Sequence, residues 1–151
     1  IIAKNPESAA HLQRQFAERT AKKTYIAITD SKPKLNAAKI DLPIGRNPSA
    51  PSTFRIDPNG KPAQTTYHVL AENDTQSLVE LKPTTGRTHQ LRVHLAYLNA
   101  PILGDRVYGK SSDCRMMLHA QKLEITLPSG ERKVFEAAIP DEFKKFFPED
   151  L

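Results

Sequence analysis

The first turns of the chain carry apolar side chains spaced three and four residues apart, at Ala9, Leu12 and Phe16. This spacing is typical of the buried face of a helix, which has 3.6 residues per turn. The preceding Asn5-Pro6-Glu7 supplies a capping side chain, a proline suited to the first helical position and an acid in the first turn. We therefore predict a helix from Pro6 to about Arg19.

Residues 24–29 change to a period of two and are rich in β-branched side chains, which is typical of a strand. Tyr25 should face the opposite side of this strand from Ile26. A second short strand is expected over residues 37–42. Five prolines between residues 43 and 62 then make regular structure improbable, so we predict a long loop there.

The remaining pattern predicts two hairpins and two helices. Residues 64–71 and 76–82 form one candidate hairpin, and residues 116–127 and 133–138 the other. Between them Leu91, Leu95 and Leu98 share one face of a helix, and Arg92 lies off that face. A short C-terminal helix covers the core with Phe143, Phe146 and Phe147.

The order of these elements is helix, strands, hairpin, helix, hairpin, helix. It favours an α+β fold with a mixed, mostly antiparallel sheet and flanking helices over an alternating βαβ fold. We expect one domain, because 151 residues suit a single compact unit.

The composition says more about the cellular compartment of the protein than about the reaction it carries out. The single Cys114 cannot form an intrachain disulfide, and a lone thiol suits a reducing compartment, so we expect a cytoplasmic or organelle-interior protein. No stretch is apolar for long enough to span a membrane, and none resembles a signal peptide. Lys and Arg number 22 against 17 Asp and Glu, a net charge of +5 that is compatible with a nucleic-acid partner.

The densest group of polar side chains lies around the predicted start of the second helix, over residues 82–94. A helix start offers free N–H groups, so an anion site is one interpretation and a solvated basic turn is the other. A two-histidine metal site is disfavoured, because His89 and His94 are five residues apart and diverge on a helix. Cys114 and His119 lack a second metal-binding pair, so we expect no metal.

Several blocks of the sequence, taken in order, resemble the RluA-type family of RNA pseudouridine synthases. The blocks lie in residues 14–27, 60–67, 86–94, 102–109 and 117–120 and together span essentially the whole chain. The most diagnostic are Gly86-Arg87-Thr88-His89-Gln90-Leu91-Arg92-Val93-His94 and Ile102-Leu103-Gly104-Asp105-Arg106-Val107-Tyr108-Gly109. The resemblance implies an isomerase that detaches uracil from ribose, turns it and rejoins it through carbon 5, with no cofactor.

The resemblance also implies roles for individual residues. Tyr25 matches the tyrosine that lies against the flipped uracil, although a strand tyrosine packed in the sheet is the plainer interpretation. Arg92 matches the basic partner of the catalytic aspartate, or else it only solvates a helix face. Leu118 matches a leucine near the bound base, and an ordinary core role explains it equally well. The phosphate contacts that we expect, with rRNA or tRNA as partner, are Lys22, Lys23, Arg87, His89 and Arg106.

One expected motif is not present in these residues. The family's aspartate stands in a His-Arg-Leu-Asp stretch just before the segment that matches residues 1–4, and none of the eight aspartates of this chain lies in such a stretch. We therefore expect residues 1–151 to be the C-terminal portion of a catalytic domain, inactive alone and partnered by the missing N-terminal part. We also expect weakened folding or self-association, because a sheet edge would be exposed. The alternative is a non-catalytic RNA-binding module derived from that family.

Overall fold

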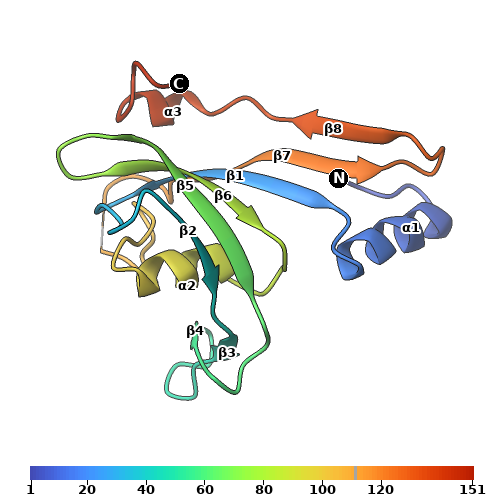
Figure 1. Cartoon of the computed structure of the whole chain (residues 1–151), viewed down its shortest axis with the longest axis horizontal. Helices are drawn as coiled ribbons and strands as arrows, with labels where there is room; N and C mark the ends of the chain where they lie inside the picture. Colours follow the sequence, from blue (N-terminus) through green and yellow to red (C-terminus); the bar gives the residue numbers. More distant parts are fainter. Residues whose placement is uncertain (111) are drawn as a thin grey trace.

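The computed structural model describes residues 1–110 and 112–151. Within these residues the chain forms three helices and eight strands, and Figure 1 shows its course. In chain order these elements are α1 (Pro6–Ala17), β1 (Lys22–Thr29), β2 (Ala37–Asp41), β3 (Ile44–Arg46), β4 (Phe54–Ile56), β5 (Gln64–Glu72), β6 (Ser77–Pro83), α2 (Gln90–Tyr97), β7 (Leu118–Thr126), β8 (Arg132–Glu136) and α3 (Asp141–Lys144).

Six of the strands form one sheet in the order β2-β5-β6-β1-β7-β8, and each neighbouring pair is antiparallel. The predicted α+β class with a mostly antiparallel sheet and flanking helices is confirmed. β3 and β4 pair separately as a two-stranded ribbon below the main sheet (Figure 1).

The alternating side chains of β1 divide the core into two layers. Ala27 is buried in a cluster with Leu91 and Leu95 of α2, and Tyr25 packs against the same cluster. Ile26 and Ile28 point the other way and are buried with Phe143 and Phe147 at the C-terminal helix. Successive side chains of a strand alternate between the two faces of its sheet, which is why one strand serves both layers. The expected opposition of Tyr25 and Ile26 is confirmed.

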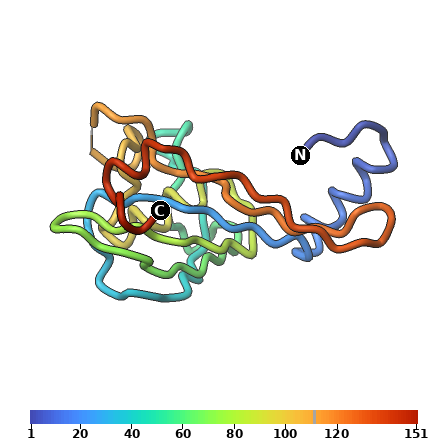
Figure 2. Tube along the Cα trace, turned by 90° about the horizontal axis from the view of Figure 1, so that it is seen from above, coloured from blue at the N-terminus to red at the C-terminus, as the bar shows by residue number. Residues whose placement is uncertain are grey.

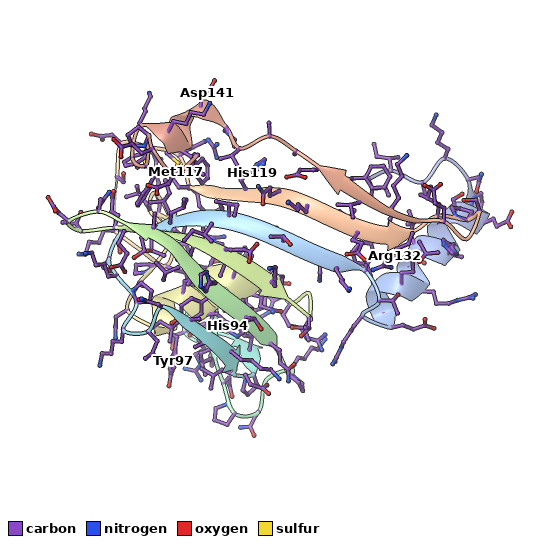
Figure 3. The ribbon with its side chains drawn as sticks, turned by 45° about the horizontal axis from the view of Figure 1, so that its top comes forward. His94, Tyr97, Met117, His119, Arg132 and Asp141 are labelled. Carbon is purple, nitrogen blue, oxygen red and sulfur yellow. The ribbon has the colours of Figure 1, made fainter. Side chains whose placement is uncertain are left out.

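One end of the sheet extends as an arm made of β1, β7 and β8, with α1 at its side (Figure 2). The side chain of Gln15 joins the helix to the strand end. It donates from Nε2 to the carbonyl oxygen of Thr126 and accepts from the Thr126 N–H, both at 2.7 Å. Arg132, at the start of β8 beside α1 in Figure 3, donates to the carbonyl oxygen of Thr20 at 2.7 Å. The arm and α1 are therefore joined by part-buried and exposed polar contacts.

The pairing of β1 with β7 shifts by one residue where the arm meets the body. Thr24 pairs with Lys122, but Tyr25 pairs with Ala120, so Gln121 is an extra residue on β7. Such a bulge bends a strand and increases its twist locally.

The prediction of a loop over residues 43–62 is wrong in part. Prolines do exclude long strands, but three-residue stretches between them pair as β3 and β4. Gly60 makes the return of the chain possible, because a Cβ there would overlap the backbone of Ile44. The other predicted elements are confirmed, with ends that differ by about two residues, as is usual for helix and strand boundaries. The exception is the C-terminal helix, which ends at Lys144, so that Phe146 and Phe147 lie beyond it.

His94 connects α2 to the sheet from a fully buried position. Its Nε2 donates to the carbonyl oxygen of Leu42 at 3.0 Å, and its Nδ1 accepts from the hydroxyl of Thr65 at 2.9 Å. This arrangement suits the neutral ring, and burial lowers the pKa of His94.

The buried His94 predicts a loss of stability in mild acid. The unfolded chain binds a proton near the ordinary pKa of 6.5, above the folded value, so the free energy of unfolding falls as the pH drops below about 7, by at most about 1.4 kcal/mol per pH unit. Denaturant unfolding at pH 7.5 and 5.5 measures this difference. His94→Gln should reduce it, and His68→Gln, at an exposed position of β5, should not. Equal pH dependence in all three proteins would contradict the assignment.

Candidate active site

A pocket of about 200 Å³ opens where β1, the turn after β6, the start of α2 and the start of β7 come together. Six of the eight predicted site residues line it. These six are Lys23, Tyr25, Arg87, His89, Arg92 and Leu118. The structure thus brings residues from three separate stretches of the chain to one place.

The other two predicted residues lie outside this pocket. Lys22 is exposed on the opposite side of β1 from Lys23, and its Nζ lies 3.8 Å from a carboxylate oxygen of Glu124. Arg106 is exposed and lines a neighbouring cavity together with Arg92 and Asp105. Adjacent strand residues point to opposite faces, so Lys22 and Lys23 cannot serve the same pocket.

The floor of the pocket is fixed by the buried amide of Gln90. Its Oε1 accepts from the hydroxyl of Thr85 at 2.7 Å and from the N–H of Arg87 at 3.0 Å. Its Nε2 donates to the carbonyl oxygen of Gln64 at 2.8 Å and to the hydroxyl of Thr65 at 3.0 Å. The Arg87 N–H is therefore bonded internally and is not a donor for an anion.

Arg92 forms a two-pronged ion pair with Asp105. Nε donates to Oδ2 and Nη2 donates to Oδ1, each at 2.8 Å. The Asp105 side chain has no exposed surface, and that of Arg92 is 16% exposed. The guanidinium carbon also lies 4.8 Å from the ring centre of Tyr108. Arg92 therefore does more than solvate a helix face, although the partner that the chain supplies is Asp105.

Tyr108 links this ion pair to the surrounding elements. Its hydroxyl accepts from the N–H of Phe54 on β4 and shares a hydrogen bond with Nδ1 of His89, both at 2.8 Å. His89 begins α2 in a left-handed conformation with φ at 55°. Tyr108 thus connects the ion pair to β4 and to the start of α2.

The pKa values of the ionisable groups around the pocket are shifted by burial and by the ion pair. Burial lowers the pKa of Lys23 and raises that of Tyr25. Burial and the positive charge of Arg92 lower the pKa of His89. The hydrogen bonds with Asp105 raise the pKa of Arg92 further. Burial alone would raise the pKa of Asp105, but its hydrogen bonds from Arg92, Val107 and Tyr108 outweigh that effect and keep the carboxylate ionised.

Besides the cavity that Arg106 lines, an apolar groove and a basic cleft share residues with the pocket. An apolar groove of about 540 Å³ lies beside Tyr25 and Lys23 and is lined also by Ile1, Phe16 and Phe135. A cleft of about 500 Å³ carries the basic side chains of Arg46, Lys61 and Arg87. Tyr25 thus lines both the pocket and the apolar groove, and Arg87 lines both the pocket and the basic cleft.

Two further findings concern metals and membranes. Across residues 1–110 and 112–151, no three His, Cys, Asp or Glu side chains are grouped as a metal ion would require. Within the same residues no helix has the length and apolar character needed to cross a membrane.

Sequence reasoning gave no role to Asp105 or Tyr108. Both lie in the Gly104-Asp105-Arg106-Val107-Tyr108-Gly109 block, which carried part of the family resemblance. The two-pronged pairing with Arg92 joins positions thirteen apart across the end of a helix, a spacing that no periodic pattern indicates.

A family model described as RNA pseudouridylate synthase matches residues 1–97. An uncharacterized RNA pseudouridine synthase of Zymomonas mobilis is 43% identical over 95% of this chain and 68% of its own length. The dual-specificity RNA pseudouridine synthase RluA of Escherichia coli is 40% identical over 91% of this chain and 66% of its own length. The ribosomal large subunit pseudouridine synthase D of Nitrosomonas europaea is 38% identical over 94% of this chain, which spans 44% of that relative.

Two solved human structures have the same fold. RNA pseudouridylate synthase domain containing 1 superposes with a TM-score of 0.81 at 36% identity, over 93% of this chain and 63% of that one. RNA pseudouridylate synthase domain containing 4 gives a TM-score of 0.76 at 31% identity, over 92% of this chain and 66% of that one. In both cases the matched region is about two thirds of the human chain.

We predict that alanine destabilises the protein more at Gly104, in the loop that carries Asp105, than at Gly130, in the turn between β7 and β8. Gly104 and Gly130 both have positive φ, at 79° and 89°, and alanine in that region costs about 1–2 kcal/mol. A Cβ at Gly104 would also collide with the carbonyl group of Arg115, whereas nothing lies within 4 Å of one at Gly130. Gly104→Ala should therefore lower the free energy of unfolding by more than Gly130→Ala in denaturant titrations. Equal losses would show that the collision is relieved without cost.

Proposed function

We propose that this chain, which belongs to the RNA pseudouridylate synthase family, forms the base-binding part of a site that isomerises uridine to pseudouridine in structured rRNA or tRNA. The observation that carries the proposal is the meeting of Tyr25, Arg92 and Leu118 at one pocket from β1, α2 and β7. One relative is named as an RNA pseudouridine synthase and another as a pseudouridine synthase of the large ribosomal subunit. These names support an RNA substrate for this chain. We place the protein in the cytoplasm or an organelle interior, where such RNAs are made.

The pocket has the groups that a flipped uridine needs. The ring of Tyr25 offers a face against which the uracil stacks, and Leu118 supplies an apolar wall. Stacking on an aromatic ring offsets part of the cost of removing a base from its helix. The basic groups of Lys23 and Arg87 bind flanking phosphates and so position the RNA without reading its sequence.

The isomerisation breaks the bond from N1 of uracil to C1′ of ribose and forms one from C5 to C1′. A proton leaves C5 and N1 gains one, so no oxidant or reductant is needed. Arg92 binds the catalytic carboxylate in two-pronged geometry and keeps it ionised. Asp105 uses only the Nε and Nη2 positions, so the Nη1 end of the guanidinium is available for this contact.

The catalytic carboxylate comes from outside these 151 residues. No Asp or Glu is among the described residues that line the pocket, and the sequence holds no His-Arg-Leu-Asp stretch. Residues 1–151 are then the C-terminal portion of a catalytic domain, inactive without the segment that bears the aspartate.

The first test is pseudouridine formation on a mixed rRNA and tRNA substrate. Protein that also contains the aspartate-bearing segment should produce pseudouridine, and the 151-residue chain, verified by intact mass, should not. Arg92→Ala should abolish turnover, and Arg92→Lys, which keeps the charge without the two-pronged geometry, should leave only a small measurable rate. The matched control Arg132→Ala, on the exposed surface of β8, should stay within about twofold. Turnover by the 151 residues alone would place the nucleophile among them, and no turnover by the longer protein would refute the function.

Tyr25 gives a second test, since its ring and its hydroxyl have separable roles. Tyr25→Phe keeps the aromatic face, so RNA carrying an unpaired uridine should bind as tightly as to the unaltered protein. Tyr25→Leu removes the stacking surface and should weaken binding by about 1–3 kcal/mol. Titration with a fluorescent RNA measures both, and an equal effect of the two substitutions would argue against stacking.

A further inference from the structure

Asp105 is a buried charge that the proposed chemistry does not use. Its backbone is fixed on both sides, since its N–H donates to Ile102 at 3.0 Å and its carbonyl oxygen accepts from Gly109 at 2.9 Å. Oδ1 accepts further bonds from the N–H groups of Val107 at 3.0 Å and Tyr108 at 3.1 Å. The carboxylate is therefore held in place independently of Arg92.

This fixed carboxylate restrains only one side of the guanidinium. Arginine has five N–H donors in one plane, and Asp105 accepts one from Nε and one from Nη2. Two donors on Nη1 and one on Nη2 remain. The ring of Tyr108, 4.8 Å from the guanidinium carbon, covers one face and limits rotation out of the plane.

Asp105 itself is badly placed to attack a base. Its side chain has no exposed surface, both oxygens already accept hydrogen bonds, and it does not line the pocket that Tyr25 and Leu118 share. Arg92, in contrast, lines both that pocket and the cavity beside Asp105. The ion pair therefore bridges two hollows, and Arg92 alone extends into the one that receives the base.

We propose that Asp105 is a positioning residue, which holds the Nε–Nη2 edge of Arg92 so that the Nη1 end points at the catalytic carboxylate. This inference rests on the proposed function. The guanidinium of Arg92 would then bind two carboxylates through different edges. The carboxylate of Asp105 stays bound throughout, and the catalytic carboxylate takes part in the reaction. Tyr108 maintains the same plane and connects it to β4 through Phe54.

The kinetic test uses the full-length protein that contains these residues. Asp105→Asn retains an oxygen for the N–H groups of Val107 and Tyr108 but cannot accept both bonds from Arg92. It should lower kcat at least about tenfold, because a small misplacement of a reacting group costs that much or more. KM for RNA should stay within about twofold. Asp113→Asn, an exposed aspartate of the same loop region, is the matched control and should change neither.

A double-mutant cycle separates positioning from simple structural support. If Asp105 acts through Arg92, the pair Arg92→Lys with Asp105→Asn should be no slower than Arg92→Lys alone. Independent, multiplicative losses would overturn the proposal. So would an Asp105→Asn protein that keeps the full kcat.

A spectroscopic measurement tests the ion pair even if no RNA is turned over. In ¹⁵N-labelled protein the Nε–H of Arg92, assigned by its loss in Arg92→Lys, should be shifted downfield and protected from exchange. Asp105→Asn should abolish that signature, and Asp113→Asn should retain it. An Nε–H that is unprotected in the unaltered protein would overturn the pairing. Retention of the signature with no pseudouridine in any RNA would refute the proposed function alone.

Discussion

The rest of the structure depends on β1, whose alternate side chains are buried in the two different layers of the core. It pairs with β6 on one side and β7 on the other, so none of its residues can shift along either neighbour without moving a side chain to the wrong face. Ile26 and Ile28 are held in the layer beneath the C-terminal helix, which leaves Tyr25 and Ala27 on the α2 side. The position of the tyrosine ring is thus set by the burial of its neighbours.

The polar floor of the site follows from a second constraint, that buried donors and acceptors need partners. Gln90, His94 and Asp105 are all buried, and within the described residues no buried side-chain nitrogen or oxygen lacks a hydrogen bond. Each of these groups connects segments distant in sequence, such as α2 with β5 through Gln90 and Thr65. A network that is fully satisfied favours one arrangement, because any change of rotamer leaves a buried group unpaired.

The sequence was most informative where a pattern ran for several residues. Two hairpins, two amphipathic helices and the strand with Tyr25 all follow from periodicity. The β3–β4 ribbon does not, because its strands have three residues each and depend on Gly60 lying against Ile44. At the site, the motif resemblance named Tyr25, Arg92 and Leu118, which the structure places at one pocket. It could not reveal the pairing of Asp105 with Arg92, which depends on a loop returning to the end of α2 in three dimensions.

The extra residue Gln121 on β7 has a consequence for how this fold can vary among relatives. Beyond the bulge neither Arg92 nor Asp105 belongs to the arm, and the arm's register is set by β7 pairing with β1 on one side and with β8 on the other. Insertions or deletions of two residues in that hairpin preserve which side chains face the groove, and the bend absorbs the change in direction. Evolution is then free to lengthen, shorten or reshape the arm to follow a new RNA contour, while the geometry around Tyr25 stays the same.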